Sequence, residues 1–168
     1  KKEVNINDIS IIGHSRGGGI VTIKTAEDSR VKNVISLAAV CDFGSRSSTI
    51  SDLENWKKTG VKYVENGRTK QQMPHFYQFY INFKENEERL NIEKSTKKIT
   101  VPHLIIHGDN DTSISVEEGK KIHSWSPKSR LEIIKNADHV FNVSHPWKKE
   151  KMSKELDQVT KICIEFLK

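Results

Sequence analysis

The sequence predicts an α/β fold in which a parallel sheet is flanked by helices. Short apolar runs rich in Val, Ile and Leu occur four times, and turn residues bound each of them. Helical patterns follow three of these runs. Such alternation is typical of parallel sheets, because a helix returns the chain to the start of the next strand. The length of 168 residues fits a single soluble globular domain.

The predicted elements of this core follow one another in a simple order. The strands are expected at residues 9–12, 31–40, 103–107 and 131–134. The helices are expected at residues 17–27, 116–125 and 153–167. The last helix carries apolar residues at helical spacing, which predicts one face packed on the sheet.

Residues 43–98 interrupt this alternation and are too long for an ordinary loop, so they predict an insertion with its own structure. The core would then comprise residues 1–42 and 99–168. Within the insertion, "MPHFYQFYINF" places four aromatic residues at helical spacing, and Pro74 is acceptable at a helix start. The four are Phe76, Phe79, Tyr80 and Phe83. Two alternatives stay open for each: packing the insertion onto the core, or lining a substrate pocket, for which Phe76 and Tyr80 are the candidates.

The stretch "GHSRG", residues 13–17, matches G-x-S-x-G between a predicted strand and a predicted helix. In that context Ser15 would sit on a sharp turn, with its hydroxyl above the sheet edge. A glycine-rich turn with an incidental serine is the plainer alternative. Two phosphate-binding alternatives fail: no Lys-Ser/Thr pair follows the glycines, and "GGGIVT" lacks the third glycine of a dinucleotide fingerprint.

A serine becomes a strong nucleophile only beside a base that a third group orients. "GDNDTSISV" follows the third predicted strand and offers Asp109 and Asp111, and "KNADHVF" follows the fourth and offers His139. The carboxyl ends of parallel strands meet at one sheet edge, so these side chains are expected near Ser15. The remaining histidines are expected to be ordinary partly buried or surface residues, and the side chain of His14 is expected to point away from Ser15.

The composition of the chain limits which kinds of partner and cofactor are expected. The formal charge of +6 comes from scattered lysine pairs without interleaved aromatic residues, so a solvated basic surface is expected and no nucleic acid. There is no apolar run long enough for a membrane span and no C-x-x-C spacing, and His103 and His107 lie in a predicted strand, where a hydrogen-bonded, partly buried imidazole is usual, so neither a metal nor an organic cofactor is implied. Cys41 and Cys163 lie far apart in the sequence, which favours reduced thiols and a cytoplasmic location.

The candidate residues follow one another along the chain in the order Ser, Asp, His. With these motifs the chain resembles the carboxyl-terminal portion of an α/β-hydrolase, in the dienelactone hydrolase, acyl-esterase and prolyl-oligopeptidase-like branch. The resemblance implies Ser15 as nucleophile and His139 as base. It implies Asp111 as the acid, from the pattern G-x-x-D-x-x-V/I, with Asp109 one step off that spacing. It also implies a lid at residues 43–98 and an oxyanion donor at the backbone N–H of Arg16.

The resemblance also implies what else the protein needs. The family's second oxyanion donor and its first strands would come from an upstream segment of the same protein that completes the fold, and a homo-oligomer is possible. The implied activity is a serine hydrolase that cleaves small-molecule carboxylic esters through an acyl-enzyme. A serine peptidase of the prolyl-oligopeptidase type and a catalytically silent binding module are the alternatives.

Overall fold

The computed structural model describes residues 5–46, 50–67 and 69–168. Residues 1–4 of the expected core segment, and 47–49 and 68 of the expected insertion, lie outside the described residues. A four-stranded parallel sheet has the order β1 (Ile9–His14), β2 (Val31–Leu37), β5 (His103–Gly108) and β6 (Ser129–Ile134). The four predicted strands and their parallel arrangement are confirmed.

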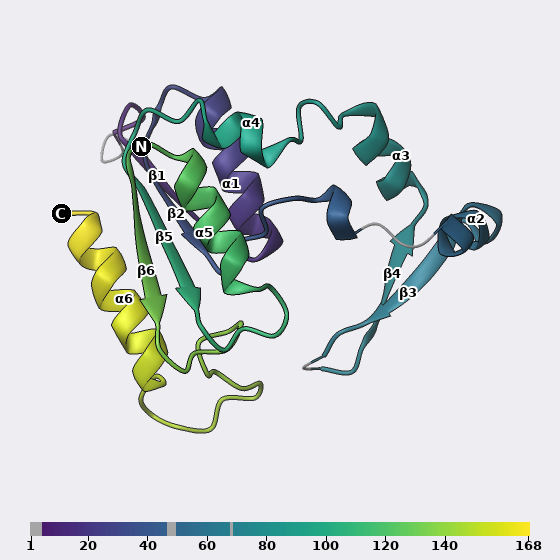
Figure 1. The fold of residues 1–168 in the computed structure, drawn as a ribbon. Coiled ribbons are helices and arrows are strands. Elements are labelled where there is room, and N and C mark those ends of the chain that lie inside the picture. The colour runs from purple at the N-terminus through teal and green to yellow at the C-terminus, as the bar shows by residue number, and fades with distance from the viewer. Residues whose placement is uncertain (1–4, 47–49, 68) are drawn as a thin grey trace.

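Helices cover both faces of this sheet, as Figure 1 shows. The first face is covered by α1 (Arg16–Glu27) and α5 (Val116–Trp125), and the second by α6 (Lys154–Phe166). The alternation of side chains along β5 explains the two layers. Leu104 and Ile106 belong to the apolar cluster under α6, whereas Ile105 packs with Ile122 of α5. All three predicted core helices are confirmed.

A buried polar network joins the first face of the sheet to α1. His103, at the start of β5, is fully buried, and its Nε2 lies 2.9 Å from Oγ of Ser36 on β2. Its Nδ1 lies 3.3 Å from Oγ of Ser126, and Ser36 Oγ lies 3.3 Å from Oγ1 of Thr22 on α1. Burial lowers the pKa of His103 to about 4, and the neighbouring His123 adds to this effect. The imidazole is therefore neutral at pH 7.

The segment between β2 and β5 forms a further group of elements, which extends to one side of α1 in Figure 1. It contains a short 3-10 helix (Gly44–Arg46), α2 (Ile50–Thr59), the antiparallel pair β3 (Val61–Glu65) and β4 (Gln72–Phe76), α3 (Gln78–Glu85) and α4 (Ile92–Thr96). The short helix α4 packs on α1, where Ile92 is buried. Arg89, just before α4, pairs with Glu27 at 2.7 Å. The insertion therefore contacts the core through α1, the helix that directly follows Ser15.

The expected helix beginning at Pro74 is wrong. Residues 72–76 form strand β4, in which Met73 and His75 are partly buried while Phe76 is 62% exposed. Pairing with β3 satisfies the backbone of this segment and fixes an alternating pattern of faces. The helix begins only at Gln78, so Phe76 does not share a helical face with Phe79, Tyr80 and Phe83.

None of the helices in the described ranges combines the length and the apolar character that crossing a membrane requires.

Candidate active site

Ser15 occupies a strained turn between β1 and α1. Its backbone has φ 58° and ψ −122°, which non-glycine residues rarely adopt. Two backbone hydrogen bonds hold it there: Ser15 N donates to Leu37 O at 2.9 Å, and Val40 N donates to Ser15 O at 3.3 Å. The end of β2 thus fixes the conformation that aims the serine side chain out of the sheet edge.

Two glycines allow this turn to form. A Cβ at Gly13 would lie 2.2 Å from the carbonyl oxygen of Gly17, and a Cβ at Gly18 would lie 2.4 Å from Cβ of Ala39. Both contacts are far below van der Waals distance, so both positions exclude larger residues. A Cβ at Gly17 would meet nothing within 4 Å among the described residues. Close approach therefore explains the first glycine of "GHSRG" but not the second.

The structure brings Ser15, His139 and Asp111 together in one line of hydrogen bonds. Nε2 of His139 lies 3.0 Å from Oγ of Ser15, and Nδ1 of His139 lies 2.8 Å from Oδ2 of Asp111. An ionised carboxylate only accepts hydrogen bonds, so Nδ1 carries the proton and donates to Asp111. Nε2 of the neutral ring is then an acceptor for the Ser15 hydroxyl. This is the arrangement in which an imidazole removes a proton from a serine.

Asp111 is held rigidly in the loop after β5. Its carboxyl group is fully buried, and Oδ1 accepts hydrogen bonds from the backbone N–H groups of Ser113 and Ile114, both at 2.8 Å. The buried His107 lies on the other side of Oδ2, with its Nε2 at 3.4 Å from Oδ2 and 2.9 Å from the Ile114 carbonyl oxygen. Of these two histidines, His139 lies closer to Oδ2, at 2.8 Å, and forms the hydrogen bond with it.

Asp109 has a different partner. Its Oδ1 accepts a hydrogen bond from the backbone N–H of Asn136, in the loop that follows β6. This contact joins the two loops that carry Asp111 and His139. Of the two candidate acids, Asp111 is the one hydrogen-bonded to the imidazole.

The structure also shows a contact between His14 and His139, which the reasoning from the sequence missed. Its Nε2 lies 2.7 Å from the carbonyl oxygen of His139, so it donates its N–H to that oxygen. The two imidazole rings lie 4.7 Å apart between centres, and His14 also lies 6.5 Å from the ring of Phe141. The proximity of His14 to Ser15 in the sequence was the available signal. The contact itself depends on the course of a loop 125 residues away.

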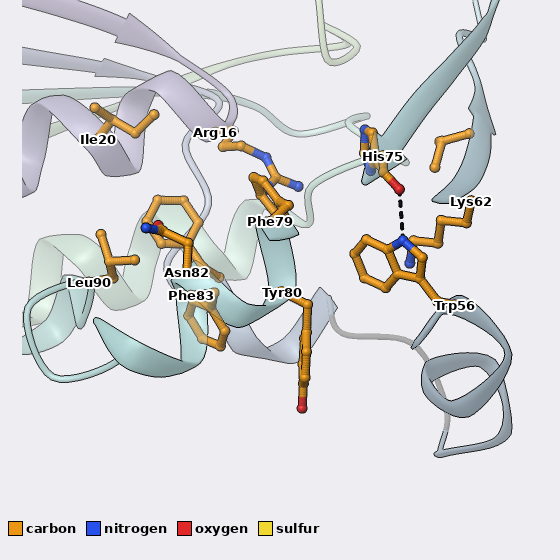
Figure 2. A pocket seen from close by; sticks show the side chains of 12 residues that line it. Arg16, Ile20, Trp56, Lys62, His75, Phe79, Tyr80, Asn82, Phe83 and Leu90 are labelled. Carbon is orange, nitrogen blue, oxygen red and sulfur yellow. Dashed lines mark hydrogen bonds between the residues drawn. The ribbon is translucent and has the colours of Figure 1, made fainter. Parts of the chain in front are cut away.

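Two cavities adjoin Ser15 and Arg16. A cleft of about 440 Å³ contains the Ser15 and His139 side chains, and residues 66 and 67 of the β3–β4 turn also line it. A second cavity of about 350 Å³ lies between α1 and the insertion, and five Phe, Trp and Tyr side chains are among those that line it. Tyr80 lines the second cavity, as Figure 2 shows, but Phe76 lines neither. The expectation for Phe76 is corrected because β4 turns this side chain outward.

The described residues contain no group of three or more His, Cys, Asp or Glu side chains that could hold a metal ion. The two buried strand histidines, His103 and His107, instead lie against hydroxyl and carbonyl oxygens of neighbouring elements.

Comparison with known proteins identifies solved structures with a similar fold. No family model and no curated protein sequence matches the chain. Among solved structures, Est1E from Butyrivibrio proteoclasticus with ferulic acid bound is similar at a TM-score of 0.71 and 21% identity, over 99% of this chain and 61% of that one. A monoacylglycerol lipase from Paleococcus ferrophilus gives a TM-score of 0.68 and 14% identity, over 96% and 68%.

A third structure, the α/β-hydrolase GrgF from Penicillium sp. sh18, gives a TM-score of 0.65 and 18% identity, over 98% of this chain and 64% of that one. The chain has the α/β-hydrolase fold, with a parallel sheet flanked by helices. It spans 57% of the length of the similar esterase domain from Rhodothermus marinus.

Proposed function

We propose that the protein carrying this chain is a serine hydrolase that cleaves carboxylic esters through an acyl-enzyme. The observation that carries the proposal is the continuous line from Ser15 Oγ through the His139 ring to Asp111, with both hydrogen bonds at 3.0 Å or less. Two proteins of similar structure support the ester class: one is a monoacylglycerol lipase, and the other, Est1E, has ferulic acid bound.

The chemistry follows from the positions of the groups. Nε2 of His139 takes the hydroxyl proton of Ser15 while Oγ forms a bond to the ester carbonyl carbon, and the carbonyl π electrons move onto its oxygen. The resulting oxyanion is stabilised by the backbone N–H of Arg16, because the first N–H groups of a helix point out of its positive end. The imidazolium formed at His139 is stabilised by Asp111.

Collapse of the tetrahedral intermediate breaks the bond to the alcohol oxygen, which leaves with the proton from His139. Water then attacks the acyl-serine while Nε2 of His139 takes one of its protons. When the bond between the acyl carbon and Ser15 Oγ breaks, His139 gives this proton to Oγ, and the carboxylic acid is released. Every proton that His139 accepts is returned, so the cycle needs no other reactant than ester and water.

The open edge of the sheet supports a further proposal about the whole protein. Within the described residues β1 pairs only with β2, and Ile12 on β1 is 50% exposed. An unpaired apolar strand edge attracts other strands. We propose that a further segment of the same protein pairs with β1 and supplies the second oxyanion donor.

The proposed activity is tested on the complete protein with a panel of p-nitrophenyl esters and a matched panel of dipeptide anilides. Ester hydrolysis that disappears in Ser15→Ala, together with labelling of Ser15 by a fluorophosphonate, is the expected result. Hydrolysis of anilides in preference to esters would instead identify a peptidase. A folded protein with no labelling of Ser15 would identify a binding module.

A further inference from the structure

Residues that are neighbours in the sequence line the aromatic cavity between α1 and the insertion and the cleft that contains Ser15. Ser15 lines the cleft, and the next residue, Arg16, lines the cavity. On the opposite wall, Lys62 and Val64 line the cavity and Asn66 lines the cleft. These three residues alternate along β3 and its extension, so one face of this segment borders both spaces. A substrate with its ester at Ser15 therefore has the cavity beside it.

The walls of this cavity suit a flat apolar group. Five of the side chains that line it are those of Phe43, Trp56, Phe79, Tyr80 and Phe83, and Figure 2 labels the last four. The indole N–H of Trp56 donates to the carbonyl oxygen of His75 at 2.7 Å, which fixes the ring. The volume of about 350 Å³ accommodates an aryl group with a short chain.

Basic groups lie among these rings. The guanidinium carbon of Arg16 lies 5.1 Å from the centre of the Phe79 ring, and Nζ of Lys62 lies 4.0 Å from that of Trp56. The His75 ring stacks on Phe79 at 5.9 Å. None of the described residues that line the cavity is an Asp or a Glu.

The electrostatic effect of this arrangement is visible at His75. Burial lowers the pKa of His75, and the positive charges of Arg16 and Lys62 lower it further. The same positive field favours a negative charge placed among these three groups. A carboxylate there would accept hydrogen bonds from the planar guanidinium of Arg16 while its aryl ring lay against the aromatic walls.

We propose that this cavity binds an aryl carboxylate group of the substrate, so that the protein hydrolyses esters with a carboxylated aromatic group on one side of the ester bond. The inference rests on the proposed ester hydrolysis at Ser15 and adds to it the charge and the aromatic character of the substrate. Arg16 and Lys62 are then specificity residues, and Ser15, His139 and Asp111 perform the reaction.

Two matched pairs of esters test the inference on the complete protein. In the first pair the charge is on the acyl side: methyl 4-carboxycinnamate and its neutral isostere methyl 4-carbamoylcinnamate. In the second pair it is on the alcohol side: 4-carboxyphenyl acetate and 4-carbamoylphenyl acetate. In at least one pair, kcat/KM should be about tenfold higher for the carboxylate, the ratio that one charge-assisted contact supplies. Added salt should reduce that preference.

The variant Lys62→Met should reduce the carboxylate-to-carboxamide ratio several-fold, mainly through KM for the carboxylate, and Lys62→Arg should restore it. Arg16→Gln keeps the backbone N–H and should reduce the same ratio. Lys58→Met, on an exposed position of α2 outside the cavity, is the matched control and should leave the ratio unchanged. Comparing ratios between variants cancels the intrinsic reactivity of each ester.

The possible outcomes separate the inference from the proposed function. Hydrolysis of both esters of each pair at equal rates, with ratios that Lys62→Met and Arg16→Gln leave unchanged, would overturn the inference and keep the ester hydrolase. Absence of hydrolysis of every ester, in a folded protein, would overturn the proposed function itself. A ratio lowered equally by Lys58→Met would attribute the preference to overall surface charge and would also overturn the inference.

Discussion

Replacing Asp111 by Asn tests how the hydrogen bonds around one carboxylate set the proton positions of the whole site. In the structure Oδ1 accepts from two backbone N–H groups and Oδ2 accepts from His139. An asparagine at this position has one acceptor and one donor group. The two backbone donors at 2.8 Å require the amide oxygen at the Oδ1 position, since an NH₂ there would face two N–H groups. The amide NH₂ must then point at His139.

This orientation reverses the tautomer of His139. Nδ1 would have to accept from the NH₂, so the proton of the neutral ring would move to Nε2, which then could not accept the Ser15 proton. Loss of the correct tautomer costs about 10⁴-fold in kcat in triads of this geometry, or about 5.5 kcal/mol of transition-state stabilisation. We expect Asp111→Asn to lower kcat for a p-nitrophenyl ester by this factor, with little change in thermal stability because the loop keeps its backbone hydrogen bonds.

Asp109→Asn is the matched control, because it is the same chemical change two residues away. The amide oxygen of the new side chain can still accept from the N–H of Asn136, so most of the activity should remain. Initial rates and melting curves for both variants complete the experiment. If Asp109→Asn abolished turnover while Asp111→Asn kept more than a tenth of it, the assignment of the acid and the tautomer argument would both be refuted.

Further predictions concern four other features. Ser15→Ala should abolish ester hydrolysis while the circular dichroism spectrum stays unchanged, and any residual burst of product would contradict its role. His14→Ala should lower kcat, because it removes the hydrogen bond to the His139 carbonyl oxygen, and His14→Gln, which keeps a donor, should restore part of the loss; equal losses in the two variants would point to packing alone. Tyr80→Ala should change the preference among esters, whereas Phe76→Ala should not, and the reverse result would contradict the lining of the cavity. The pKa of His103 is about 4 in the folded protein against 6.5 for a free imidazole, so the folded state binds this proton less readily than the unfolded state. The free energy of unfolding should therefore fall by about 3 kcal/mol as pH drops from 6.5 to 4. Urea titrations at a series of pH values check this, and in His103→Gln the free energy of unfolding should depend less on pH.

The core of this fold could be predicted from the sequence because each buried strand is a short, nearly continuous apolar run. Such runs occur where both faces of a strand are covered, and here α5 and α6 cover the two faces of β5. The insertion could not be predicted in the same way. The segment "MPHF" pairs with β3 as a strand, although Phe76 fits the helical spacing that Phe79 and Tyr80 continue. A pattern of four aromatic residues cannot report where a strand ends and a helix begins.

The candidate triad could be predicted for a related reason. Chain order and the convergence of parallel strand ends place Ser15, Asp111 and His139 at one edge, and no long-range detail is needed for this. The contact of His14 with the His139 backbone and the choice between two neighbouring aspartates depend on loop conformation. Hydrogen bonds inside the loop after β5 decide that choice, because they turn Oδ2 of Asp111 toward the imidazole.

The two parts of the molecule meet at Arg16, and this position has a consequence for how the protein could change its substrate. The backbone of Arg16 begins α1 directly after the turn in which hydrogen bonds to Leu37 and Val40 hold Ser15, and its side chain lines the aromatic cavity formed with the insertion. In the proposed mechanism its N–H stabilises the oxyanion, and in the proposed substrate complex its guanidinium pairs with a carboxylate. A side-chain replacement alters only the second role, since the N–H is common to nineteen amino acids. Substitutions in the insertion and at the side chain of residue 16 can therefore change which ester is selected without moving the atoms of Ser15, His139 and Asp111.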